Sequence, residues 1–140
     1  MVRRYYLLDT NIISEPARPV PDRKVLEKIE RYSPVAAMSA ISWHELLYGL
    51  NLVEKKDRRT ELEHYLFNVV SRLYPVIPYD EHAASVHADI RAVQQKNGTP
   101  KPLLDSQIAA VAIANNMILV TRNTDDFDGI PGLMCENWFE

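Results

Sequence analysis

The sequence predicts an α/β domain in three layers, in which a short parallel β-sheet is flanked by helices. Short apolar runs alternate with helical stretches along the 140 residues, and no repeat or low-complexity tract interrupts them. The apolar runs contain no polar residue, as expected of parallel strands that are covered on both faces. The length is about that of one domain, so we expect a single domain over residues 1–140.

The first predicted strand covers residues 5–8, and the rest of the chain is organised around it. This apolar run stops at Asp9, Thr10 and Asn11, residue types that compete poorly with a strand ladder. Three prolines within residues 16–21 then forbid a regular helix and indicate a loop. Ligands of open parallel sheets bind beyond the carboxyl ends of the strands, so we expect a site at the end of this strand.

The second predicted strand, residues 35–38, ends at Ser39 and lies between two predicted helices. The first of these helices should begin at Asp22, which suits an N-cap. The second should begin with Ser42 as its N-cap, and Glu45 then follows at the spacing of a capping box. Helix capping is therefore one explanation of Glu45, and binding chemistry is the other.

The central part of the chain is predicted to be mainly helical. Residues 62–73 carry apolar side chains at helical spacing, and a charged break precedes them. Residues 74–77 are a short strand candidate, with Pro75 at its edge or start. One helix should then run from about Asp80 to Lys96. Another should cover residues 103–114, which are so rich in Ala and aliphatic residues that most of its surface must be covered.

The last strong strand signal is at residues 117–120, with Thr121 directly after it. Asp9, Ser39 and Thr121 thus each follow a predicted strand. Because these strands are predicted to be parallel, with right-handed crossovers as the default, the three residues should lie at one edge of the sheet. Asp126 follows shortly after Thr121 in the chain, so we expect it near the same edge.

Composition excludes several classes of protein. The formal net charge is −3, so the domain lacks the basic footprint of a duplex-binding protein. Its scattered Lys and Arg residues, Lys101 and Arg122 among them, are interpreted as solvated surface, and attraction of a polyanionic substrate by these local cations is the alternative. The single Cys135 favours a reducing compartment. The apolar run at residues 5–8 is too short for a signal peptide or a membrane span. We therefore expect a cytoplasmic protein that does not contact a membrane.

The candidate functional residues are the acids Asp9, Glu45, Asp105 and Asp126. Carboxylates crowded into one pocket repel one another, so at neutral pH they need protons or a cation to coexist. Mg²⁺ prefers oxygen ligands, and a cation held in this way lowers the pKa of water and stabilises a leaving oxygen. These acids therefore point to a phosphodiesterase. Dispersed histidines and a single Cys do not indicate a zinc site.

Each acid also has a local explanation. An Asp directly after a strand, such as Asp9, is a common turn former. Asp105 can cap a helix, although an idle charge in its apolar surroundings would be costly. Asp125 and Asp126 are typical of solvated acids in loops. The neighbouring Thr and Asn residues are typical of side chains that form hydrogen bonds within turns. The four acids are persuasive only as a set.

Four segments, taken together, resemble the successive motifs of PIN-domain ribonucleases, and most closely the toxin branch of VapBC-type toxin–antitoxin modules. They have the order and separations of that family and span nearly the whole chain. The segments are residues 7–11 (LLDTN), 39–49 (SAISWHELLYG), 104–109 (LDSQIA) and 120–127 (VTRNTDDF).

The resemblance implies a Mg²⁺- or Mn²⁺-dependent RNA endonuclease that uses a metal-activated water. It also implies a homodimer and an antitoxin protein as partner. Its metal-binding acids would be Asp9, Glu45, Asp105 and Asp126, and the residues that orient them would be Thr10, Asn11, Ser39, Thr121 and Asn123.

The position of the fourth acid varies within the PIN-domain ribonucleases. In the family this acid stands either at the site of Asn123 or just before the Phe. Asn123 is an amide and carries no charge, and Asp125 is a neighbour of Asp126. We assign the fourth position to Asp126, with Asn123 assisting.

Two other functions remain open at this stage. The first is a phosphatase or phosphotransfer domain with Asp9 as covalent nucleophile. The haloacid-dehalogenase type has a second Asp two residues later, where this chain has Asn11. The second is a non-catalytic PIN-like module that only binds a partner.

Overall fold

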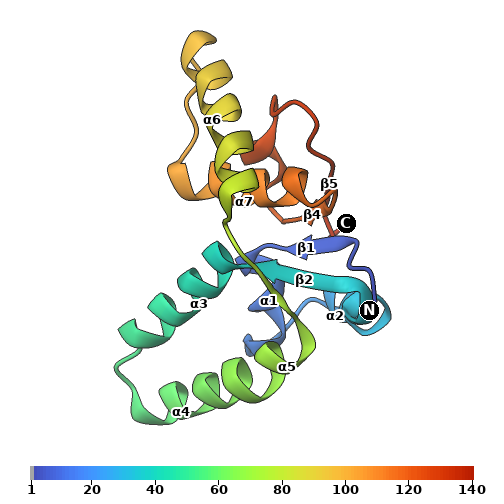
Figure 1. The fold of residues 1–140 in the computed structure, drawn as a ribbon. Coiled ribbons are helices and arrows are strands. Elements are labelled where there is room, and N and C mark those ends of the chain that lie inside the picture. The colour runs from blue at the N-terminus through green and yellow to red at the C-terminus, as the bar shows by residue number, and fades with distance from the viewer. Residues whose placement is uncertain (1) are drawn as a thin grey trace.

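A computed structural model describes residues 2–140. Its centre is a parallel sheet of five short strands in the order β3-β2-β1-β4-β5 (Figure 1). This confirms the predicted α/β class with a short parallel sheet flanked by helices. The strands are β1 (Tyr6–Leu8), β2 (Ala36–Ser39), β3 (Val76–Ile77), β4 (Ile118–Val120) and β5 (Cys135–Glu136).

Helices cover both faces of this sheet. In Figure 1, α6 and α7 lie on one side of the strands, and α1 to α5 lie on the other. The α-helices are α1 (Thr10–Ile13), α2 (Arg23–Tyr32), α3 (Ala40–Leu52), α4 (Lys56–His64), α5 (Ser71–Leu73), α6 (Glu81–Lys96) and α7 (Leu103–Ala114). Shorter turns are the 3-10 helices Glu15–Ala17, Ser33–Val35 and Thr124–Phe127, and a π-helical stretch at Tyr65–Val70.

The three layers follow from the alternation of side chains along each strand. In β1, Leu7 is part of the hydrophobic core under α6 and α7, whereas Leu8 belongs to the core on the opposite face. Leu119 and Val120 divide between the same two cores in β4. All four side chains are fully buried, so the strands are apolar throughout because both faces are covered.

The carboxyl ends of the three central strands meet at one edge of the sheet, as predicted. Leu7 pairs with Ala37 of β2 and with Leu119 of β4. The backbone N–H of Asp9 donates to the carbonyl of Val120 at 2.9 Å, which extends the ladder to the point where the acid begins. Asp9, Ser39 and Thr121 therefore leave three neighbouring strands side by side.

The structure corrects the start of the helix after β2. The N-cap of α3 is Ser39 and not Ser42, because the extended backbone of Ser39 lets its Oγ accept a hydrogen bond from the Ser42 N–H at 3.0 Å. Ser42 is buried in the first turn instead. Glu45 is then six residues beyond the cap, so the capping-box explanation of Glu45 is wrong.

Three smaller features also differ from the prediction. Residues 10–13, for which no element was predicted, form the helix α1, and part of the proline-rich loop predicted at residues 16–21 belongs to the 3-10 turn Glu15–Ala17. The carboxyl end, predicted only as a short segment, contains the edge strand β5, which pairs with β4.

Within residues 2–140, no helix combines the length and apolar composition that a membrane span requires.

Candidate active site

Asp9 lies at the centre of the candidate site and is 7% exposed. It follows the last residue of β1 and is the N-cap of α1, where its Oδ1 accepts a hydrogen bond from the Thr10 N–H at 2.8 Å. Its Oδ2 accepts a second hydrogen bond from Thr121 Oγ1 at 2.9 Å. The end of one strand, the start of a helix and the end of the neighbouring strand thus fix this carboxylate.

Thr121 connects Asp9 to two amide residues. Its hydroxyl is fully buried and accepts hydrogen bonds from Asn11 Nδ2 at 3.3 Å and from the Asn123 N–H at 3.1 Å. Asn11 Nδ2 also reaches Asp9 Oδ2 at 3.5 Å, and Asn11 Oδ1 accepts from the Arg122 N–H at 3.1 Å. These bonds hold the segments after β1 and β4 together and orient the Thr121 hydroxyl towards Asp9.

Glu45 is brought to the same edge by α3. Its Oε1 accepts a hydrogen bond from Thr10 Oγ1 at 3.0 Å, so Thr10 binds Asp9 through its backbone and Glu45 through its side chain. Ser39, also predicted to support the acids, has hydrogen bonds to the Ser42 N–H and to Ser42 Oγ. Ser39 therefore acts on Glu45 by fixing the start of the helix that carries it.

The other two acids come from the second half of the chain. Asp105 lies half-buried in the first turn of α7. Asp126 lies exposed in the 3-10 turn Thr124–Phe127, where its N–H donates to the carbonyl of Asn123 at 3.0 Å. The neighbouring Asp125 is also exposed.

The four carboxylates act on one another. Burial raises the pKa of Asp9, and the charges of Glu45 and Asp126 raise it further, whereas hydrogen bonds from Thr121 and Thr10 lower it. Burial also raises the pKa of Asp105, and the charges of Asp9 and Asp126 add to that rise. The positive charge of Lys101 opposes it. Negative charge is therefore unfavourable at this edge of the sheet unless a cation compensates for it.

The donor chemistry suits a hard divalent cation, because the acids offer only carboxylate oxygens. The side chains are not drawn together into a finished coordination sphere. Among residues 2–140, no group of three or more Asp, Glu, His or Cys side chains has the arrangement needed to hold a metal ion. Burial is the main cause of the raised pKa values of Asp9 and Asp105, and the charges of the neighbouring acids add to it.

The sequence of this chain also matches a known family of domains. The family model described as PIN domain matches residues 6–133. The chain belongs to the PIN domain family.

Relatives of this PIN domain are toxins and ribonucleases. Toxin FitB of Neisseria gonorrhoeae is 32% identical over 137 residues, which cover 96% of this chain and 99% of that protein. The tRNA(fMet)-specific endonuclease VapC of Shigella flexneri is 31% identical over 133 residues, with 95% and 97% covered.

Solved structures share the fold closely. The crystal structure of FitAcB from Neisseria gonorrhoeae matches with a TM-score of 0.89 and 30% identity, covering 96% of this chain and 99% of that chain. VapBC2 of Rickettsia felis, solved bound to a DNA fragment from its promoter, matches with a TM-score of 0.82 and 28% identity, covering 96% and 98%.

Lys101 contributes to the electrostatics of the site, which was not predicted from the sequence. It was grouped with the scattered surface cations, yet its charge acts on Asp105. The available signal was its position four residues before Asp105. This spacing brings side chains together only within a helix, and α7 begins at Leu103, after Lys101.

Proposed function

We propose that this PIN domain, over residues 1–140, is a divalent-metal-dependent endoribonuclease and the toxin of a type II toxin–antitoxin pair. The observation that carries the proposal is the buried Asp9, held by Thr121 and Thr10 within the electrostatic reach of three further acids. The names of the relatives agree with this assignment, since they include tRNA(fMet)-specific endonuclease VapC and Ribonuclease VapC2.

Asp9, Glu45, Asp105 and Asp126 are the residues that would hold Mg²⁺ or Mn²⁺. When bound, the cation supplies Lewis acidity at a phosphodiester and lowers the pKa of an attacking water. The raised pKa values of Asp9 and Asp105 support this role, because burial and the neighbouring acids both disfavour their negative charge, which a cation would compensate.

The other side chains of the site would keep these acids oriented. Thr121 Oγ1 and Asn11 Nδ2 both donate to Asp9 Oδ2 and so fix the orientation of that carboxylate. Thr10 bonds to both Asp9 and Glu45 and so couples their positions. Removing such orienting partners typically costs about 10–100-fold in metal affinity or activity.

We also propose that the protein is cytoplasmic, forms a homodimer and is inhibited by an antitoxin. Large apolar side chains are exposed on the helices that lie on the side of the sheet opposite α6 and α7, and such side chains are candidates for contacts with a partner. They include Tyr48 and Leu52 of α3, Phe67 of the π-helical stretch and Leu73 of α5. The structural neighbours crystallised as toxin–antitoxin complexes support such a partner.

The test is RNA cleavage by the purified protein with Mg²⁺ or Mn²⁺. The variants Asp9→Asn and Asp105→Asn should lose cleavage and should no longer arrest growth when expressed, while circular dichroism shows an intact fold. Asp126→Asn should lose activity and the adjacent Asp125→Asn should retain it, which makes the second a matched control for charge. Cleavage that persists unchanged in excess EDTA contradicts the metal-dependent mechanism.

A further inference from the structure

Two cavities flank the connection between α6 and α7, next to the candidate active site. One measures about 270 Å³ and is lined by Arg91, Ala92, Gln94, Gln95, Pro100, Lys101 and Leu103. The other measures about 290 Å³ and is lined by Gln94, Asn97, Thr99, Lys101, Asp128 and Gly129. Gln94 and Lys101 are shared, so these two side chains stand between the cavities.

The first of these, which we call the Lys101 cavity, is suited to an anion. Its charged lining residues are Arg91 and Lys101, and its amides are Gln94 and Gln95, with no carboxylate among them. The second cavity includes the carboxylate of Asp128, which repels anions. Neither Arg91 nor Lys101 forms an ion pair within the part of the chain that the structure describes. Both cations are therefore available to a ligand.

Gln94 connects the Lys101 cavity to the acids. Its side chain is 7% exposed, and its Oε1 accepts a weak hydrogen bond from Ser106 Oγ at 3.5 Å. Its Nε2 is buried and has no hydrogen-bond partner within residues 2–140. A buried amide donor without a partner is costly, so an acceptor at this position would be stabilising. Ser106 directly follows Asp105, which also feels the charge of Lys101.

We propose that the Lys101 cavity binds a backbone phosphate of the RNA strand, adjacent to the phosphate that lies at the acids. This inference rests on the proposed ribonuclease function and extends it to one contact of the substrate. Arg offers a planar fork of donors to phosphate oxygens, and Lys offers a compact charge. The cavity is slightly below the range of about 300–1,000 Å³ typical of small-molecule sites, which fits one phosphate group of a longer ligand.

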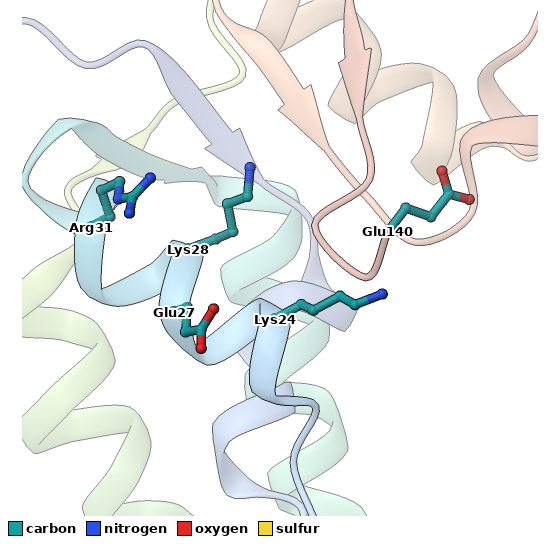
Figure 2. A pocket seen from close by; sticks show the side chains of 5 residues that line it. All are labelled: Lys24, Glu27, Lys28, Arg31 and Glu140. Carbon is teal, nitrogen blue, oxygen red and sulfur yellow. The ribbon is translucent and has the colours of Figure 1, made fainter.

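The matched control is Lys28, which lines a separate cavity of about 130 Å³ with Lys24, Glu27, Arg31 and Glu140 (Figure 2). Lys28 lies on α2, whose carboxyl end leads through Ser33–Val35 into the amino end of β2. That is the edge of the sheet opposite the acids. Lys28→Gln and Lys101→Gln change the net charge equally, and both side chains are only partly buried, so neither should disturb folding.

The experiment measures binding of a fluorescein-labelled single-stranded RNA of about ten nucleotides, by anisotropy, in EDTA and at several salt concentrations. One phosphate contact contributes about 0.7 to the slope of log affinity against log salt. For a tenfold dilution of salt, from about 1 M to about 0.1 M, this slope corresponds to about a fivefold gain in affinity from the one contact. Lys101→Gln should therefore weaken binding about fivefold at roughly 0.1 M salt and reduce the slope by about 0.7. Lys28→Gln should behave as wild type, and Lys101→Arg should retain binding.

The outcomes separate this inference from the proposed function. If Lys101→Gln matches wild type in affinity and slope while wild type cuts RNA, the phosphate contact is refuted and the nuclease remains. Wild-type protein that does not bind the RNA at all also refutes the contact. If Lys101→Gln shows the predicted reduction in salt slope but the wild-type protein never cuts RNA, the phosphate contact is supported and the nuclease assignment is refuted.

Discussion

The variant Thr121→Val tests how the fold holds Asp9. Thr121 is fully buried, and its hydroxyl is the donor to Asp9 Oδ2 as well as the acceptor for Asn11 Nδ2 and the Asn123 N–H. Valine has nearly the same shape and removes all three hydrogen bonds. The carboxylate of Asp9 then remains buried with one donor fewer.

The expected loss of stability follows from these contacts. A hydrogen bond to a charged group contributes about 1.5–3 kcal/mol, and each neutral bond from the partly exposed amides adds about 0.5 kcal/mol. We therefore expect the free energy of unfolding to fall by about 3 kcal/mol, which corresponds to roughly 10 °C in Tm for a chain of this size. The Thr121 hydroxyl also lowers the pKa of Asp9 against the effect of burial, so its removal should raise that pKa further.

The assay is urea unfolding of the EDTA-treated protein, followed by the fluorescence of the buried Trp138. A group with a raised pKa stabilises the fold below its ordinary pKa and loses that contribution as pH rises through its folded value. The decrease in the free energy of unfolding caused by Thr121→Val should thus be smaller at a pH where Asp9 is protonated. In a plot of cleavage rate against pH, the acidic limb should move to higher pH. The exposed Thr60→Val is the matched control and should change stability by less than about 0.5 kcal/mol. Equal urea midpoints for Thr121→Val and wild type would refute the reasoning.

Two further predictions concern the cap of α3 and the bound cation. Ser39→Ala removes the cap of α3 and should lower the free energy of unfolding by about 1–2 kcal/mol in urea titrations; an unchanged midpoint contradicts the assigned cap. Mn²⁺ at about 100 times its Kd should stabilise the fold by about 2.7 kcal/mol near pH 7 in thermal melts. This gain should shrink towards pH 4, because Asp9 and Asp105, with raised pKa values, take up protons first. An equal shift at both pH values excludes these carboxylates as ligands.

Elements with explicit end signals were predictable from the sequence. α7 covers Leu103–Ala114 as predicted, because Pro102 precedes it and two asparagines follow it. α6 begins after its cap Asp80 and ends before Gly98, whose φ of +67° favours glycine. The three central strands β1, β2 and β4 could also be predicted, since burial on both faces removes polar residues from them.

Other features were decided by contacts between distant parts of the chain. Ser39 and Ser42 are three residues apart and both suit a cap, and only the end of β2 selects Ser39. The two residues of β5 are too few to show a period, so only pairing with β4 defines that strand.

The candidate site divides in the same way. The position of Asp9 after a strand could be predicted, but the hydrogen bond that Thr121 donates to it joins residues 112 positions apart in the sequence. Likewise, the bond from Thr10 to Glu45 spans 35 residues, and the spacing of Glu45 instead suggested a cap that the structure does not contain. The sequence pattern therefore predicted which acids to expect at this edge of the sheet, while the contacts that orient them required the fold.

The proposed function depends on divalent-cation binding by Asp9, Glu45, Asp105 and Asp126. The most direct measurement is calorimetric titration of the EDTA-treated, dialysed protein with Mn²⁺. Wild-type protein should bind Mn²⁺, and Asp9→Asn and Asp105→Asn should each weaken binding at least about tenfold, whereas Asp125→Asn should not. Binding that is absent in wild type, or that is unchanged by Asp9→Asn and Asp105→Asn, would contradict the account.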